Sequence, residues 1–254
     1  MILAVDAGNS NIVLGCMEGL EIRHTLRLKT DRATSAAGYT VTLQAALAQA
    51  GFSIAGFEGG ILSSVVAAVT EPLRQALSAL LSGPVLVVGK TAKTTLPLCI
   101  DQPETIGADL IAAAEGALAQ YAPPLVLIDM GTATTFSVLD KSGAFLGGAI
   151  APGVQLGAEA LTQRTGLPMT ELSAPQSPLS HSTTDCLCSG IIYGAAAMVD
   201  GMLDRLETAL GTPVTAIATG GLARCVIPHC RRPVTLDDQL LLRGLAVMYR
   251  REMT

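Results

Sequence analysis

The sequence predicts an α/β protein made of two similar halves, each with a parallel or mixed sheet covered by helices. A short motif occurs twice after an apolar run, as DAGNSN at residues 6–11 and as DMGTATT at residues 129–135. More strand-like sequence follows each copy, which indicates a strand, a turn and a second strand. The chain has 254 residues, of which 50% are hydrophobic and 3% aromatic. This composition suits Ala-rich helices on sheets rich in Val, Leu and Ile.

The first half alternates between strand and helix patterns, which is typical of an α/β sheet. Apolar periodicity predicts helices at residues 36–50, 71–81 and 105–119, and strands at residues 1–5, 12–16, 21–29, 60–66 and 85–88. The last of these helices ends before Pro123-Pro124, which we interpret as the hinge between the halves.

The second half repeats the three-strand start and then alternates in the same way. It predicts strands at residues 125–129, 136–139, 147–150 and 215–218, and helices at residues 153–164, 183–210 and 238–251. A polar, proline-containing loop is expected at residues 168–182.

Both copies of the motif have the composition of a phosphate-binding turn. Gly8 or Gly131 allows a turn whose backbone N–H groups face an anion. Neighbouring amide and hydroxyl side chains add neutral donors, and the aspartate can hold a cation against phosphate oxygens. One such turn after a strand is usually an ordinary turn. Two copies in equivalent places predict homologous halves that face one nucleotide.

A third acid, Asp109, lies in the helix predicted for residues 105–119. Thr105 is a candidate N-cap, which places Asp109 about one turn inside the helix among small and apolar residues. An aspartate in a helix is ordinarily a surface residue. Here Gly107 permits close approach of a ligand, and the helix stands before the hinge, where a cleft between the halves is expected.

Charge and hydropathy argue against two classes of partner. The formal net charge is −5, from 16 basic and 21 acidic residues, and the basic residues are scattered, so nucleic acid is not an expected partner. The start lacks the cationic region of a secretory signal, and no uninterrupted apolar run approaches ~18 residues. We therefore expect no membrane span and a cytoplasmic protein.

The six cysteines do not have the spacing of a zinc site. Cys186 and Cys188 lie close in sequence, and His229 precedes Cys230, which leaves a metal site as an alternative. Reduced structural thiols are the favoured interpretation.

Taken in order, the motifs resemble the type III pantothenate kinases, members of the acetate kinase, sugar kinase, Hsp70 and actin superfamily. The matching stretches span nearly the whole chain, at residues 6–11, 103–109, 129–136, 147–153, 183–190, 218–223 and 241–245. The run DMGTATTF together with GAD at residues 107–109 is specific to that family.

The resemblance implies two tandem ribonuclease-H-like (actin-like ATPase) domains with mixed five-stranded sheets and flanking helices. Residues 1–120 are expected to carry the first phosphate turn and the catalytic aspartate, and residues 121–254 the second turn and a nucleotide-binding Gly-Gly segment. It also implies a cytoplasmic homodimer that phosphorylates pantothenate with ATP, the first step of coenzyme A biosynthesis. The implied cofactors are Mg²⁺ and K⁺ or NH₄⁺.

Roles for single residues follow from the same resemblance. Asp109 is the expected base for the pantothenate hydroxyl, Asp129 the ligand of a monovalent cation, and Asp6 a site for Mg²⁺ through the phosphates. The ATP phosphates are assigned to Asp6, Ala7, Gly8, Asn9, Ser10, Asn11, Ile12, Val13 and Thr132. The pantothenate contacts are assigned to Ile100, Gly107, Ala108, Asp109, Leu110 and Thr183.

Two departures from the family pattern fall on the pantothenate side. Leu110 stands where the family usually has arginine, and Ile100 stands where it usually has an aromatic residue. The retained Asp6, Asp109 and Asp129 favour an active pantothenate kinase. The two departures favour a nucleotide-binding homologue with a regulatory or accessory role, and a kinase for another small hydroxylated acceptor is the third hypothesis.

Overall fold

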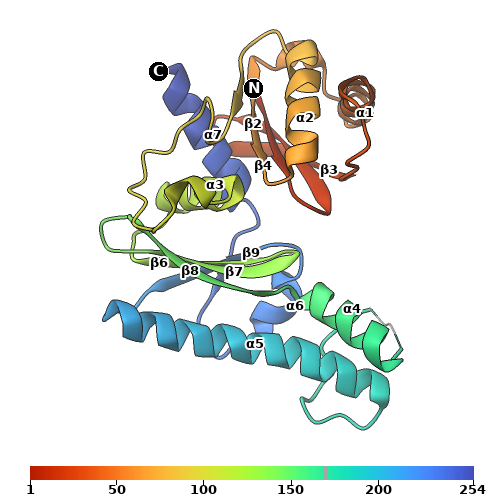
Figure 1. Cartoon of the computed structure of the whole chain (residues 1–254), viewed down its shortest axis with the longest axis vertical. Coiled ribbons are helices and arrows are strands. Elements are labelled where there is room, and N and C mark those ends of the chain that lie inside the picture. The colour runs from red at the N-terminus through yellow and green to blue at the C-terminus, as the bar shows by residue number, and fades with distance from the viewer. Residues whose placement is uncertain (169–170) are drawn as a thin grey trace. The chain divides into compact units, whose positions relative to one another are not determined.

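The computed structural model describes residues 1–168 and 171–254, and the chain forms two compact units (Figure 1). Unit 1 comprises Met1–Leu96, Asp101–Gln120 and Gln239–Thr254, and unit 2 comprises Pro97–Ile100 and Tyr121–Asp238. These units differ from the predicted halves 1–120 and 121–254 in two segments. The C-terminal helix belongs to unit 1, and residues 97–100 belong to unit 2.

Unit 1 is built on a five-stranded sheet in the order β3-β2-β1-β4-β5. Strands β1 to β3 are antiparallel neighbours, whereas β4 and β5 run parallel to β1. The strands are β1 Ile2–Ala7, β2 Asn11–Glu18, β3 Glu21–Lys29, β4 Gly59–Ser64 and β5 Val85–Val87. The helices are α1 Ala36–Gln49, α2 Ala67–Leu80, α3 Ala108–Leu118 and α7 Leu240–Met253, with 3₁₀ turns at η1 Ile54–Gly56 and η2 Pro103–Thr105.

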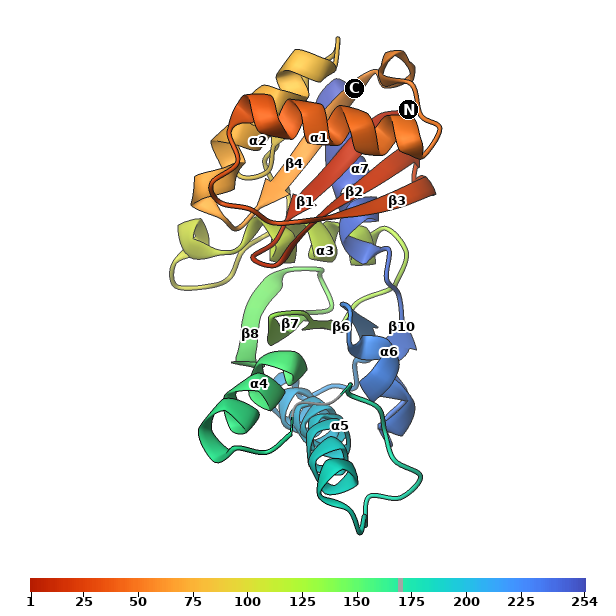
Figure 2. The same cartoon turned by 90° about the vertical axis from the view of Figure 1, so that its right-hand side faces the viewer.

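Helices cover both faces of this sheet (Figure 2). Alternate residues of β1 point to opposite sides, so Leu3 and Val5 join the core under α1 and α2, whereas Ile2 and Ala4 join the core under α3 and α7. Burial on both faces explains the continuous apolar run that predicted this strand.

Helix α7 joins unit 1 because it crosses α3 at backbone distance. A Cβ atom on Gly116 of α3 would lie 2.0 Å from the carbonyl oxygen of Leu240, and one on Gly244 of α7 would lie 1.7 Å from that of Ala112. Arg251 adds an ion pair, with Nη1 3.0 Å from both carboxylate oxygens of the buried Glu115. This close crossing holds α3 in place, and the first turn of α3 contains Asp109.

Gly244→Ala is therefore expected to lower the free energy of unfolding by about 1–3 kcal/mol, because the added methyl group overlaps a backbone that side-chain rotation cannot move. Urea denaturation checks this. Gly194→Ala is the matched control, because nothing lies within 4 Å of a Cβ atom at this helical glycine, so that variant should be as stable as the wild type or more so. Equal stability of Gly244→Ala and the wild type would contradict the close crossing.

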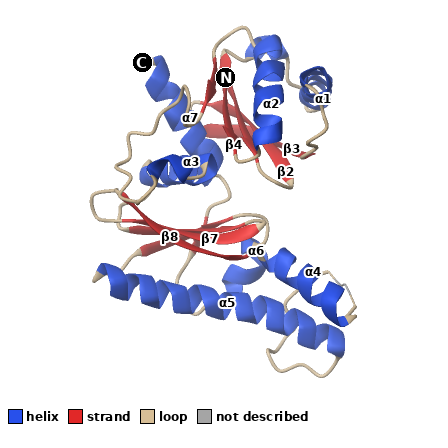
Figure 3. Ribbon diagram, in the orientation of Figure 1, coloured by secondary structure: helices blue, strands red, loops and turns tan. Residues whose placement is uncertain are grey.

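Unit 2 repeats the topology of unit 1. Its sheet has the order β10-β9-β6-β7-β8, with β6 to β8 antiparallel and β9 and β10 parallel to β6. The strands are β6 Leu125–Met130, β7 Ala133–Leu139, β8 Phe145–Pro152, β9 Thr215–Thr219 and β10 Thr235–Leu236. The helices are α4 Val154–Thr165, α5 Thr183–Leu210 and α6 Ala223–Val226, followed by the 3₁₀ turn η3 Ile227–His229 (Figure 3). The predicted duplication is thus present in the order and direction of the strands.

Helix α5 is long and apolar enough to span a membrane by length and composition, which the sequence analysis did not expect. This is weak evidence, because the core helix of a soluble protein has the same features. Its side chains at Ile192, Ala196 and Val199 are buried in the core of unit 2 with residues of β6 and β7. One face of α5 is therefore part of the core of unit 2.

Candidate active site

The first phosphate turn follows β1 in unit 1, and its aspartate has a hydroxyl neighbour. Asp6 pairs with Ser63 on the parallel strand β4 and with Val13 on β2. The hydroxyl of the buried Ser63 donates to Asp6 Oδ1 at 3.0 Å. A buried hydroxyl is costly without a partner, so this bond fixes the direction of the carboxylate.

Hydrogen bonds close this turn and fasten it to the segment after β3. The Gly8 N–H donates to the Asn11 carbonyl at 2.9 Å, and the Thr30 N–H donates to the Ser10 carbonyl at 3.1 Å. The Thr30 hydroxyl donates to the Gly8 carbonyl at 2.7 Å. Because the N–H of Gly8 is used inside the turn, the donors for an anion must come from its neighbours.

The second phosphate turn follows β6 in unit 2 and is one residue shorter. The strand pair next to the second turn is Met130 with Thr134. The strand pair next to the first turn is Ala7 with Ile12. The Gly131 N–H donates to the Ala133 carbonyl at 3.0 Å. The two turns share a place in the topology and differ in their internal hydrogen bonding.

Two glycines from distant segments approach this second turn. A Cβ atom on Gly153 would lie 2.2 Å from the Thr132 carbonyl oxygen, and one on Gly220 would lie 2.5 Å from Asp129 Oδ1. Gly220 also has φ +95°, a region that favours glycine. The fold thus brings together three segments that the sequence analysis singled out, at residues 129–136, 147–153 and 218–223.

Asp129 has two threonines beside it in strand register, where Asp6 has one serine and one valine. Its neighbours in strand register are Thr135 on β7 and Thr219 on β9, and cross-strand neighbours point to the same face. The Thr135 hydroxyl oxygen is buried and has no hydrogen-bond partner among the described residues. At Asp6 the position equivalent to Thr135 is the apolar Val13. A carboxylate with nearby hydroxyl oxygens is the donor set that a hard cation takes.

Asp109 lies in the first turn of α3, and its side chain folds back on the helix start. Its Oδ1 accepts the N–H of Leu110 at 2.8 Å. Burial raises the pKa of Asp109 above its ordinary value, and the backbone hydrogen bonds oppose this shift without cancelling it. A partly desolvated carboxylate with a raised pKa is a suitable general base.

The structure corrects the predicted start of this helix. The N-cap is Gly107 and the helix begins at Ala108, so Asp109 lies in the first turn rather than one turn inside. The Thr105 hydroxyl bonds back to the Gln102 carbonyl at 2.8 Å, within the 3₁₀ turn that Pro103 begins. A Cβ atom on Gly107 would lie 2.3 Å from Asp109 Oδ1, so this glycine gives room to the carboxylate itself.

The residues assigned to pantothenate fall in both units. Gly107, Ala108, Asp109 and Leu110 are consecutive at the start of α3 in unit 1. Ile100 belongs to unit 2, where its Cγ2 would lie 3.5 Å from a Cβ atom on Gly147 of the edge strand β8. Thr183 is the exposed first residue of α5, at another place in unit 2.

Three residues that bond to the first turn were not predicted from the sequence. Ser63, Thr30 and Arg32 each bond to the turn, and Arg32 Nη2 donates to Asn9 Oδ1 at 3.1 Å. Ser63 could have been found from its position at the end of a buried parallel strand, where ligand-binding residues gather. Nothing in the sequence indicated that the segment after β3 folds onto the turn.

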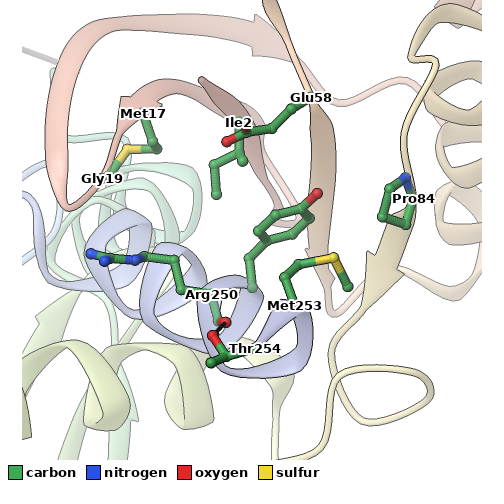
Figure 4. Close-up of a pocket in the computed structure, with 9 residues that line it drawn as sticks. Ile2, Met17, Gly19, Glu58, Pro84, Arg250, Met253 and Thr254 are labelled. Atoms are coloured by element: carbon green, nitrogen blue, oxygen red, sulfur yellow. Dashed lines mark hydrogen bonds between the residues drawn. The ribbon is translucent and has the colours of Figure 1, made fainter.

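A pocket of about 510 Å³ in unit 1 does not contain these residues (Figure 4). It lies at the start of β1 and the end of α7, where Ile2, Met17 and Arg250 line it. Asp6 is at the other end of β1. The candidate site is therefore defined by the turns and not by this pocket.

In the described part of the chain, no group of three or more His, Cys, Asp or Glu side chains is placed to hold a metal. All six cysteines are free.

Comparison with known proteins identifies the family. The profile of the type III pantothenate kinase family matches residues 2–205. A type III pantothenate kinase of an Exiguobacterium species is 38% identical over 252 residues, which cover 99% of both chains. The corresponding protein of Moorella thermoacetica is 35% identical over 252 residues, again covering 99% of both chains.

Solved structures of low sequence identity share the fold. The ROK family glucokinase of Streptomyces griseus, in complex with glucose and AMPPNP, has a TM-score of 0.56 at 15% identity and covers 98% of both chains. The activator of the 2-hydroxyisocaproyl-CoA dehydratase of Clostridium difficile, with bound ADPNP, has a TM-score of 0.56 at 12% identity and covers 99% of this chain and 95% of that chain. The predicted fold class is confirmed by these likenesses and by the two mixed five-stranded sheets. Because the family profile covers most of the chain and full-length relatives are this similar, the chain belongs to the type III pantothenate kinase family.

Proposed function

We propose that this chain transfers the γ-phosphoryl group of ATP to the hydroxyl of pantothenate, with Asp109 as the general base. Membership of the type III pantothenate kinase family supports the reaction. The observation that carries the role of Asp109 is its carboxylate at the start of α3, whose pKa burial raises. The remaining oxygen, Oδ2, faces the acceptor hydroxyl in this mechanism.

Each part of the site has one task in the transfer. The turn at residues 6–13 and Thr132 bind the ATP phosphates through backbone N–H, amide and hydroxyl groups. Asp109 takes the proton of the attacking hydroxyl. Phosphoryl transfer depends mainly on positioning and charge stabilisation, so this division suffices.

The cations implied by the family fit the residues present. At the first turn, Ser63 fixes the direction of Asp6. This carboxylate would bind the Mg²⁺ that the ATP phosphates also bind. Asp129 with the unpartnered hydroxyl of Thr135 suits K⁺ or NH₄⁺. When bound, these cations neutralise phosphate charge. The protein's part is to hold Asp6 and Asp129 in fixed directions.

Replacing K⁺ with Na⁺ is expected to lower activity, and Asp129→Ala should abolish the difference between the two salts. Thr135→Val keeps the side-chain shape and removes one oxygen, so it should weaken the K⁺ response only in part. The rise in melting temperature on adding K⁺ measures binding without turnover. The matched control is Thr134→Val, which removes another buried, unpartnered hydroxyl one residue away, on the opposite face of β7. Equal responses of the two threonine variants would exclude Thr135 as a ligand.

A homodimer and a cytoplasmic location are part of this proposal. Unit 2 exposes large apolar side chains on β8 and α4, among them Ile150 at 78% and Leu156 at 47%. Exposed apolar side chains mark a surface that binds a partner chain where they form one contiguous patch, and we propose such a patch on β8 and α4. The relatives are enzymes of small-molecule metabolism by name, which favours the cytoplasm.

An assay of ADP release with and without pantothenate tests the proposed reaction. Release that depends on pantothenate supports the kinase. ATP binding without pantothenate-dependent release would instead support an accessory protein or a kinase for another acceptor, which Leu110 and Ile100 favour.

A further inference from the structure

The two phosphate turns contain no basic residue of their own. Asp6 is the only charged residue in positions 6–13, and Asp129 is the only one in positions 129–135. Backbone N–H groups and neutral side chains provide partial positive charge, but a polyphosphate carries several full negative charges. Sites for transferring phosphoryl groups usually add an arginine or a lysine to the metal ions. A cation from elsewhere in the chain would add to the positive charge that the metal ions bring to the turn.

Arg32 places such a cation at the first turn. Its Nη2 donates to Asn9 Oδ1 at 3.1 Å, and both residues are exposed, so a bound molecule can reach them. Within the described residues, the Arg32 guanidinium makes no other hydrogen bond and no ion pair. A guanidinium has five donors, which leaves four for a ligand.

The backbone that carries Arg32 is fixed on both sides. Before it, Thr30 bonds to Ser10 and Gly8 of the turn at 3.1 and 2.7 Å. After it, the Ala33 N–H and the Thr34 hydroxyl each donate to the Asp31 carboxylate at 2.9 Å. The buried Tyr39 donates its hydroxyl to the Asp31 carbonyl at 2.6 Å. Arg32 is thus held beside the turn before any ligand binds.

The nearest acid in sequence does not neutralise Arg32. The hydrogen bond from Ala33, followed by that from Thr34, lowers the pKa of Asp31. These bonds direct the Asp31 carboxylate into its own loop. The positive charge of Arg32 is left for a ligand at the turn.

We infer that Arg32 binds the phosphate oxygens of the nucleotide held at the first turn, and that Asn9 orients its guanidinium. This inference rests on the proposed nucleotide-binding function of residues 6–13. It adds a phosphate-binding residue from outside the turn itself. A charge-assisted hydrogen bond of this kind corresponds to about a 10- to 100-fold change in binding or rate.

The test compares Arg32→Ala and Arg32→Lys with the wild-type protein. Arg32→Ala is expected to weaken binding of a non-hydrolysable ATP analogue about 10- to 100-fold, with adenosine binding and the KM for pantothenate unchanged. Arg32→Lys should recover part of the loss, because it keeps the charge without the planar donors. Calorimetric titration measures the affinities.

The matched control is Arg23→Ala. Arg23 is an exposed arginine near the start of β3, the strand that ends before Arg32, and it is paired with Glu18 and Glu21, so its loss changes the net charge equally and spares the turn. Equal ATP affinity of the two alanine variants would overturn the inference. So would an equal loss of ATP and adenosine binding together with a lower melting temperature, which indicates a structural role. A wild-type protein that binds no ATP would overturn the proposed function as well.

Asn9 provides an independent check through a double-mutant cycle. If Asn9 acts by orienting Arg32, the effects of Asn9→Ala and Arg32→Ala on ATP affinity should be less than additive. Additive effects would mean that Asn9 does not orient Arg32.

Discussion

Asp109→Asn is expected to lower kcat by about 10²- to 10⁴-fold, the usual contribution of a positioned general base. Asparagine keeps the size of the side chain and an oxygen that can accept the Leu110 N–H, so the start of α3 should be preserved. ATP binding should change little, because the phosphate turns do not include this residue. Steady-state kinetics and calorimetric titration of the ATP analogue measure the two quantities.

The raised pKa of Asp109 adds a prediction about stability and pH. Because burial raises this pKa, the charged carboxylate costs the folded state free energy at neutral pH. Lowering the pH through the raised pKa protonates the group and removes that cost, while it also removes the base. As the pH is lowered, the activity of the wild type should therefore fall, while the contribution of Asp109 to the free energy of unfolding becomes less unfavourable. Asp109→Asn lacks the charge, and it should be at least as stable as the wild type at neutral pH.

A suitable control is Glu104→Gln, which neutralises an exposed acid five residues earlier. Its turnover should match that of the wild type. Turnover of Asp109→Asn within about threefold of the wild type would remove Asp109 from the mechanism.

The duplicated architecture could be predicted from sequence because it depends on local patterns. The apolar run before each Asp-x-Gly and the alternation of strands with helices each report local structure. The same reasoning could not assign α7 to unit 1. That assignment depends on Gly116 and Gly244, which are far apart in the sequence and fit each other only across the helix crossing.

The candidate site shows the same division between local and long-range information. Asp6, Asp109 and Asp129 could be predicted as site residues because each belongs to a short motif. Ser63 and Arg32 bond to the first turn from positions 57 and 23 residues away from their partners. Thr105 was misassigned as a cap because its hydroxyl satisfies the preceding 3₁₀ turn, a competition that helix propensity does not reveal.

Restoring the family's arginine, as Leu110→Arg, is expected to lower the KM for pantothenate about 10- to 150-fold with little change in kcat. A charge-assisted hydrogen bond from an arginine at position 110 to pantothenate would correspond to roughly 1.5–3 kcal/mol. Such a contact exists in the ground state and the transition state alike, so it acts on KM and not on kcat. Leu110→Gln is the control without charge, and it should leave KM near the wild-type value.

The position of Leu110 makes this variant informative about Asp109 as well. The two residues are adjacent in the first turn of α3, where the positive end of the helix dipole opposes a cation by about 0.3–1 kcal/mol. A positive charge there should also lower the pKa of Asp109, so the acidic limb of the pH–rate profile should move to lower pH.

A lower KM with that shift would mean that the chain has kept a pantothenate site whose affinity was reduced by one residue. A wild-type KM in the micromolar range that Leu110→Arg worsens would mean that another basic residue, such as Arg164, has taken over the contact. If neither protein phosphorylates pantothenate while both bind ATP, the accessory-protein or altered-acceptor function replaces the one proposed.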